Sequence, residues 1–340
     1  MLEYNSFIYS IIQHMFTPAI QQQYQAIHEK VGLLDCSHMG KIELKGPDAR
    51  SFLHRLTSQD IQNLPAPQLR YALLLDNKGK IIADMTVWSL ADRFLVLTNP
   101  SLKERAQQHL QKYLVSEEVT IQDRTGDFSI LVLQGPLASP FLQELNSYIP
   151  SGVLVGQDIT REELRYFILI PKTAFDSFFS TLYREGKSVG LQTIEPVVQE
   201  ILRIENGVPL YGKDFSEENL PPEARLFRAI SYTKGCYPGQ EIVARLKTYG
   251  GYRRQLVGLK IFGDLPVGAR RASPLRLFDH EIEIGRVTSS CFSPQWNGPI
   301  AMGYVPRAIV AEVKRLEIGH ENQRAPAEII ELPGLPLRDP

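Results

Sequence analysis

The chain has 340 residues, enough for two or three domains, and its apolar fraction of 43% is sufficient for a sizeable core. Its 37 lysines and arginines balance 38 acidic residues, so bulk charge gives no reason to expect a nucleic-acid or membrane partner. Three cysteines far apart in the sequence, Cys36, Cys236 and Cys291, argue against a disulfide framework and favour a reducing compartment. The triplet Cys36-Ser37-His38 has no second half at ligand spacing, so we predict no metal site.

The N-terminal region gives no sign of a membrane span or a targeting segment. The apolar run at residues 7–12 is too short to span a bilayer, and no basic segment precedes it. No arginine occurs before Arg50, which argues against a mitochondrial presequence. We therefore expect a cytoplasmic protein.

One strand-helix unit occurs twice. Residues 41–45 alternate apolar and polar side chains as a half-buried strand does, and Gly46-Pro47-Asp48 separates them from a predicted helix that ends at Leu56. Residues 131–145 repeat the strand, the Gly-Pro pair and the pattern Ala-x-x-Phe-Leu-x-x-Leu. Two copies are too few for a solenoid, so the repeat predicts two related split-βαβ units packed around a pseudo-symmetric cleft.

The rest of the chain follows the same patterns. A hairpin is predicted at 71–88, turning through Asp76-Asn77-Lys78-Gly79, and helices are predicted at 101–114, 174–184 and 195–205. Beyond Tyr252 the periodicity becomes that of short strands at 254–262, 281–290 and 300–305, separated by Gly- and Pro-rich turns. This pattern of short strands and turns predicts a small C-terminal β-barrel.

The most distinctive stretch surrounds Cys236. Its motif residues are Lys234, Gly235, Cys236, Tyr237, Gly239, Gln240, Glu241 and Arg245. They predict a loop that delivers a thiol to the start of a helix, where the helix dipole and nearby cations can lower its pKa. A small buried thiol of no functional importance is the alternative, but glycines on both sides favour a functional one.

A second chemical stretch lies at residues 203–214, just before the cysteine loop. Glu205 is predicted at a helix C-terminus, the unfavourable end of the dipole for a carboxylate, so it needs a partner such as Arg203 or a ligand donor. An ordinary solvated glutamate is the alternative.

Together these stretches resemble the YgfZ-type folate-binding proteins, relatives of the glycine cleavage T protein, an aminomethyltransferase. Residues 31–37, 46–49, 71–84, 284–289 and 300–305 are also similar to this family, so the resemblance covers nearly the whole chain. It implies an α+β fold, a three-domain cloverleaf of two ferredoxin-like split-βαβ units and a C-terminal β-barrel. We expect residues 20–125 with 185–250 to form the first, folate-binding region, 126–184 the second α+β subdomain, and 251–330 the barrel.

The resemblance also implies site residues and a cofactor. Glu205 would anchor the pterin of tetrahydrofolate or a one-carbon derivative, since a carboxylate can accept two parallel hydrogen bonds. Lys234 would be a basic folate contact, and Tyr211 and Glu223 belong to the same matching segment.

One difference from the T-protein sequence bears on which of two functions the chain has. In the T protein a strand runs into a Lys-Asp pair whose Asp is catalytic, but the aligned position here falls on Arg105 or Ala106, unless a slipped register lets Glu104 substitute. Because Cys236 belongs to the YgfZ-type motif, our first hypothesis is a monomeric folate-binding accessory factor for iron-sulfur cluster assembly or repair. The thiol would contact a cluster or a client protein transiently, since enclosing a cluster takes about four ligands, and tRNA-modifying enzymes would be supported indirectly, without direct nucleic-acid binding.

Two other functions stay open. A tetrahydrofolate-dependent aminomethyltransferase would need a general base, for which the sequence offers Glu104 or Asp84. A cysteine-nucleophile hydrolase is the weakest hypothesis, because no histidine lies in a recognisable motif.

Overall fold

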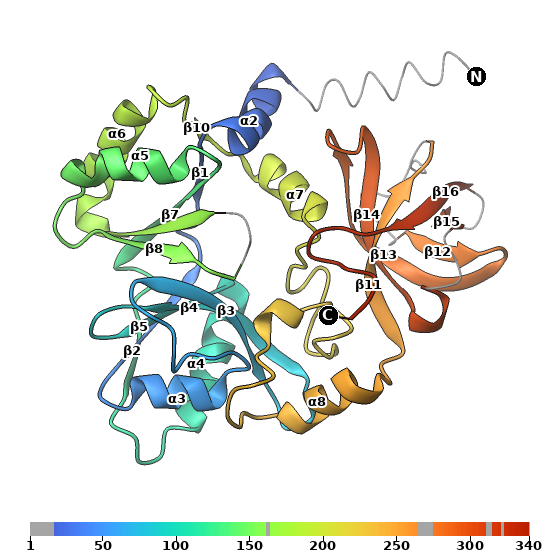
Figure 1. The fold of residues 1–340 in the computed structure, drawn as a ribbon, viewed down its shortest axis with the longest axis horizontal. Helices are drawn as coiled ribbons and strands as arrows, with labels where there is room; N and C mark the ends of the chain where they lie inside the picture. The colour runs from blue at the N-terminus through green and yellow to red at the C-terminus, as the bar shows by residue number, and fades with distance from the viewer. Residues whose placement is uncertain (1–16, 161–163, 264–274, 311–314, 321–322, 340) are drawn as a thin grey trace.

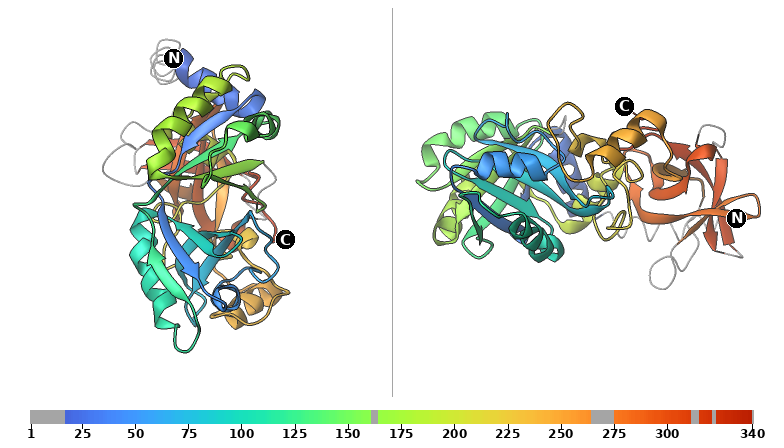
Figure 2. Two further views of the ribbon diagram at one scale, coloured as in Figure 1. Left: turned by 90° about the vertical axis from the view of Figure 1, so that its left-hand side faces the viewer. Right: turned by 90° about the horizontal axis from the view of Figure 1, so that it is seen from below.

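A computed structural model describes residues 17–160, 164–263, 275–310, 315–320 and 323–339. It consists of an α/β body and a β-barrel that lie side by side, as the view from below shows (Figure 2). No helix in the described residues is long and apolar enough to cross a membrane.

The body contains one sheet of ten strands in the order β10-β1-β7-β9-β8-β3-β4-β5-β2-β6 (Figure 1). The strands are β1 (Gly32–Asp35), β2 (Gly40–Lys45), β3 (Gln68–Leu75), β4 (Ile81–Ser89), β5 (Phe94–Thr98), β6 (Thr120–Asp123), β7 (Phe128–Gln134), β8 (Leu154–Asp158), β9 (Arg165–Pro171) and β10 (Gln192–Thr193). The two repeated units are the two halves of this sheet, joined edge to edge where β3 pairs in parallel with β8. Strand β1, from the N-terminal part of the chain, pairs with β7 in the second half.

The helices cover the sheet in a pattern that follows their apolar stripes. They are α2 (Pro18–Glu29), α3 (Ala49–Leu56), α4 (Lys103–Lys112), α5 (Ala138–Leu145), α6 (Phe175–Gly186), α7 (Pro196–Glu205) and α8 (Gln240–Tyr249). Helices α3 and α4 pack on one face of β2 to β5, and α5 and α6 pack on β1, β7 and β9. Helices α2 and α7 pack on the opposite, inner face, which runs across both halves of the sheet.

The C-terminal part is a closed barrel in the order β11-β14-β13-β12-β15-β16. Its strands are β11 (Arg254–Ile261), β12 (Arg276–Asp279), β13 (Ile282–Ser293), β14 (Gly298–Pro306), β15 (Arg315–His320) and β16 (Gln323–Ile330). The predicted fold class, an α+β body of two related units with a C-terminal barrel, is therefore confirmed. Barrel closure removes the free edges that these short strands would otherwise expose.

Candidate functional site

The cysteine motif forms the junction between the β3–β4 hairpin and α8. Gly239 is the residue before α8 and has a φ of 78°, a conformation that suits glycine. A Cβ atom there would lie 2.5 Å from the backbone oxygen of Asp76, at the hairpin turn. The glycine thus lets the start of α8 contact the turn directly.

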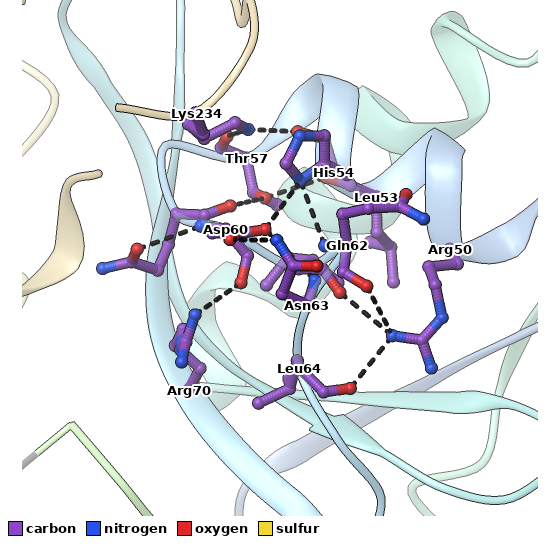
Figure 3. A network of polar contacts seen from close by, with 12 residues as sticks. Arg50, Leu53, His54, Thr57, Asp60, Gln62, Asn63, Leu64, Arg70 and Lys234 are labelled. Carbon is purple, nitrogen blue, oxygen red and sulfur yellow. Dashed lines mark hydrogen bonds and ion pairs between the residues drawn. The ribbon is translucent and has the colours of Figure 1, made fainter. Parts of the chain in front are cut away.

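Within that motif, Lys234 points toward the end of α3, as Figure 3 shows. Its Nζ donates to the carbonyl oxygens of His54 and Thr57, the latter at 2.6 Å, which are carbonyls left free at the helix C-terminus. Burial lowers the pKa of the Lys234 ammonium to about 8. Cys236, two residues on, is exposed. The structure therefore gives Lys234 protein partners, and its predicted contact with folate stays a prediction.

Glu205 is buried, with an exposed fraction of 2%. Its carboxylate accepts hydrogen bonds from the Tyr24 hydroxyl at 2.9 and 3.1 Å, from the Ser293 hydroxyl on β13, and from the Gln295 amide at 3.4 Å. These donors are the compensating partners that a carboxylate at a helix C-terminus needs. A depression lined by Tyr24 and Gln295 lies beside this group.

Arg203 and Asp214, at the two ends of the stretch 203–214 that contains Glu205, connect the body to the barrel. The Arg203 guanidinium donates to Asp214 at 2.6 Å and to Ser289 of β13 at 2.7 Å. The fully buried Asp214 carboxylate also accepts from Ser289 at 2.7 Å and from Thr288 at 2.5 Å. This network, together with Glu205 and Ser293, forms a seam along β13.

The other two predicted folate contacts, Tyr211 and Glu223, have hydrogen-bond partners of their own. Tyr211 donates to Glu217 at 2.6 Å and accepts from Arg105 at 3.0 Å. Glu223 is 8% exposed; it accepts from the Leu220 amide at 3.1 Å and lies 3.7 Å from Arg254 of β11. None of these partners is shared with Glu205 or Lys234, so these hydrogen bonds do not link the four predicted folate contacts to one another.

Asp84 on β4 is the carboxylate whose surroundings favour proton transfer. It pairs with Leu73 of β3 and faces the inner side of the sheet. One apolar cluster, with Tyr71 and Leu73, lies on one side of it, and a second, with Leu69 and Trp88, lies on the other. Its Oδ2 accepts a hydrogen bond from the Tyr71 hydroxyl at 3.0 Å, and its buried Oδ1 has no partner among the described residues. Burial raises the pKa of Asp84 to about 6, against the opposing effect of the Tyr71 hydrogen bond.

The second carboxylate that sequence reasoning offered is placed differently. Glu104 is exposed in the first turn of α4, a helix whose apolar side packs on the other face of the sheet from Asp84. Its neighbour Arg105 contacts Tyr211 and Glu217. No group of three or more His, Cys, Asp or Glu in the described part of the chain could hold a metal ion.

Comparisons with known proteins identify the family. The GCVT N-terminal domain matches residues 3–151, and the glycine cleavage T-protein C-terminal barrel domain matches residues 254–334. An aminomethyltransferase of Synechocystis is 31% identical over 317 residues, which cover 88% of this chain and 84% of that protein. Another from Desulfitobacterium hafniense is 29% identical over 326 residues, 91% of this chain and 88% of that protein.

A solved structure agrees with these relatives. The glycine cleavage system aminomethyltransferase T from Bartonella henselae has a TM-score of 0.79 and 26% identity, covering 93% of this chain and 89% of that one. These findings contradict our first hypothesis, an iron-sulfur assembly or repair factor linked to tRNA modification, because these curated relatives and this structure are named aminomethyltransferases. They favour the alternative instead, and the chain belongs to the glycine cleavage T-protein family.

Proposed function

We propose that the chain binds tetrahydrofolate and transfers a one-carbon unit to it from an aminomethyl donor. The observation that carries this proposal is Asp84, a carboxylate with a raised pKa and a buried free oxygen on the inner face of the sheet. The names of the relatives supply the reaction class, and Asp84, one of the two bases that the sequence offered, would supply the general base in place of the missing aspartate.

Asp84 and Tyr71 are partly exposed on an otherwise apolar part of the inner face, where a flat heteroaromatic ligand would meet them. Apolar and aromatic side chains, Leu69, Trp88, Leu73 and Tyr71, flank Asp84 on both sides along the sheet. Sites for such ligands combine an apolar wall with a few placed polar groups, and the unpaired Oδ1 is such a group. When bound, tetrahydrofolate would supply the nitrogen that takes up the one-carbon unit.

Asp84 would act as a proton acceptor at Oδ1. A base with a pKa near 6 is ionised at neutral pH and is still basic enough to take a proton from an amine held against it. Tyr71 fixes the carboxylate by donating to Oδ2, so that Oδ1 keeps one orientation. The apolar neighbours shield the half-buried carboxylate from part of the surrounding water, which strengthens its electrostatic interactions.

Glu205, Lys234, Tyr211 and Glu223 remain our proposed folate contacts. Glu205 and Lys234 already have protein partners, so a ligand reaching either group has to share or displace those hydrogen bonds. Substitutions Glu205→Gln and Lys234→Met, measured by isothermal titration with tetrahydrofolate, test each contact: an unchanged affinity would remove that residue from the site. Cys236 stays a predicted functional thiol, exposed in its loop and without a part in this proton transfer.

The decisive experiment compares Asp84→Asn with Glu104→Gln in two assays, tetrahydrofolate binding and turnover of an aminomethyl-lipoyl donor. We expect Asp84→Asn to retain binding and to lose turnover by about 10²- to 10⁴-fold, the usual contribution of a general base. Glu104→Gln should keep both, because that carboxylate is exposed on another face. Full turnover by Asp84→Asn would refute Asp84 as the base, and a wild-type protein without folate binding at millimolar ligand would refute the function.

The pH dependence of turnover gives an independent check. A base must be deprotonated to act, so the rate should fall as the pH drops through about 6. Tyr71→Phe removes a hydrogen bond that favours the ionised form of Asp84. It should therefore move the acid limb of the pH–rate profile, where the rate falls, to higher pH. A limb that stays in place in Tyr71→Phe would mean that another group controls the rate.

A further inference from the structure

Residues 331–339, here called the C-terminal strap, leave the barrel after β16 and cross back over the body. In Figure 1 the chain ends between α8 and the barrel. Leu332 and Leu335 are buried in one cluster with Ile204 of α7. The Gly334 amide donates to the carbonyl oxygen of Asn206 at 2.8 Å, so the strap lies directly over the end of α7.

The last described residue of the strap, Asp339, lies among donors from three separate segments. Its carboxylate accepts hydrogen bonds from Arg225 in the loop before α8, from Tyr252 at 2.5 Å and from Arg307 after β14 at 2.8 Å. Paired guanidinium groups around one carboxylate are a common arrangement for binding oxyanions, because each presents several N–H donors in one plane.

Arg225 combines a buried side chain with an unfavourable backbone conformation, as residues at ligand sites often do. Its side chain is fully buried, and its backbone has a φ of 58°, a left-handed conformation that residues other than glycine rarely adopt. Such conformations cost about 1–3 kcal/mol and persist where the surrounding structure imposes them, often at ligand sites. The strap carbonyls of Pro336 and Arg338 also accept from this guanidinium.

The group of donors exceeds what a single carboxylate can satisfy. Three buried donor atoms around Asp339 have no acceptor in the part of the chain that the structure describes: Arg225 Nε, Arg307 Nη1 and the hydroxyl of Tyr232. Burial is the larger cause of the raised pKa of Tyr232, and the negative charge of Asp339 is the smaller one. Unpaired buried donors are costly, so they point to an additional acceptor. The side chains of Asp339 and Arg307 are 21% and 35% exposed, which leaves a route for a solute anion.

We propose that Arg225, Tyr252 and Arg307 form a binding site for a phosphate group, which Asp339 occupies when no ligand is present. A phosphate has more acceptor oxygens than a carboxylate and could pair with donors that Asp339 leaves free. Its binding displaces Asp339 and frees the last residues of the strap from Arg225, Tyr252 and Arg307. This inference does not rest on the proposed folate chemistry, since none of its residues belongs to the Asp84 site.

The test uses the full chain and inorganic phosphate, with chloride added to hold the ionic strength constant. Asp339→Asn removes the internal competitor and should bind phosphate at least tenfold more tightly than wild type in isothermal titration. Adding Arg307→Gln to that variant should abolish the gain; this half-exposed side chain is a safer choice than the fully buried Arg225. Asp92→Asn, which removes another carboxylate from surface ion pairs with Lys45 and Arg93, is the matched control and should bind as wild type does.

Hydrogen exchange provides the second readout. In wild type, saturating phosphate should accelerate amide exchange in residues 337–339, since bound phosphate frees the end of the strap. Equal phosphate affinity in wild type and Asp339→Asn, or exchange that phosphate leaves unchanged in wild type, would overturn the proposal. Citrate in a parallel titration distinguishes the anion: tighter binding of citrate than of phosphate would show a polycarboxylate site and refute the phosphate assignment.

Discussion

The half-buried Asp84 should make the wild-type protein lose stability, relative to Asp84→Asn, as the pH rises from acid to neutral. Folding raises the pKa of this carboxyl from 3.8 to about 6, because burial disfavours its charged form. A group with a raised folded-state pKa contributes its full stability below the unfolded pKa and loses it as the pH rises through the folded pKa. Here that window runs from about pH 4 to about pH 6.

The size of the effect follows from the two pKa values. A shift of about two units corresponds to roughly 3 kcal/mol of free energy of unfolding, at 1.36 kcal/mol per unit. Asn cannot ionise, so its free energy of unfolding lacks this dependence. The Asn side chain also places an amide where Oδ1 was, and the cost of burying it is independent of pH. The difference between the two proteins should therefore change by roughly 3 kcal/mol across the window, whatever its absolute value.

Urea unfolding of both proteins at several pH values between 4 and 8 measures this change. Asp127→Asn is a suitable control, because Asp127 is a half-exposed carboxylate in a surface pair with Arg124. Its difference from wild type should vary little with pH, as expected for exposed ion pairs. A difference between wild type and Asp84→Asn that stays constant within about 0.5 kcal/mol would show that Asp84 is ionised without penalty, and the reasoning for it as a tuned base would fail.

Three further substitutions test the seam and the cysteine motif. Asp214→Ala should lower the free energy of unfolding in urea by about 1–3 kcal/mol, because it removes a buried acceptor of Arg203, Ser289 and Thr288 while Arg203 keeps its pair with Glu200; a loss below about 0.5 kcal/mol would mean that the seam is not a strong contact. Gly239→Ala forces a methyl group to within 2.5 Å of the Asp76 carbonyl at a φ of 78°, so its Tm should drop, with a cost of about 1–3 kcal/mol. Cys236→Ser, at an exposed position, should leave stability within about 0.5 kcal/mol and tetrahydrofolate affinity unchanged; a tenfold weaker affinity would place the thiol against the ligand.

The local structure of the chain could be predicted largely from the sequence, but its assembly could not. The alternation in residues 41–45 and the Asn206-Gly207 stop give strand β2 and the end of α7, because both signals are local. The parallel pairing of β3 with β8, which joins the two repeats into one sheet, depends on residues far apart in sequence. Strand β12 carries too few residues for a clear alternation and was missed.

Sequence reasoning treated the candidate site residues by type, whereas their contacts depend on tertiary structure. Glu205 was expected to need a partner at a helix end, and Tyr24, 181 positions away, supplies it. Lys234 was chosen as a cation near a ligand, but it interacts with carbonyls at the end of α3. Asp84 was named only as a possible base, since a polar residue in an alternating strand normally faces solvent. It is half-buried, because its strand neighbours on the inner face belong to the apolar clusters under α2, α7 and the loops before α8.

The absence of the expected aspartate, whose aligned position falls on Arg105 or Ala106, does not remove the capacity for base catalysis. A guanidinium has no acceptor atom, so Arg105 cannot take that part. Its partner Glu217 is an exposed carboxylate whose pKa is lowered, first by the Tyr211 hydrogen bond, which makes it a weaker base. Asp84 has the opposite shift, because its carboxylate is desolvated and keeps one oxygen unpaired. The base that we propose for this chain therefore lies on β4, at the inner face of the sheet, whereas Arg105, one of the two positions aligned with the T-protein aspartate, belongs to a surface ion pair.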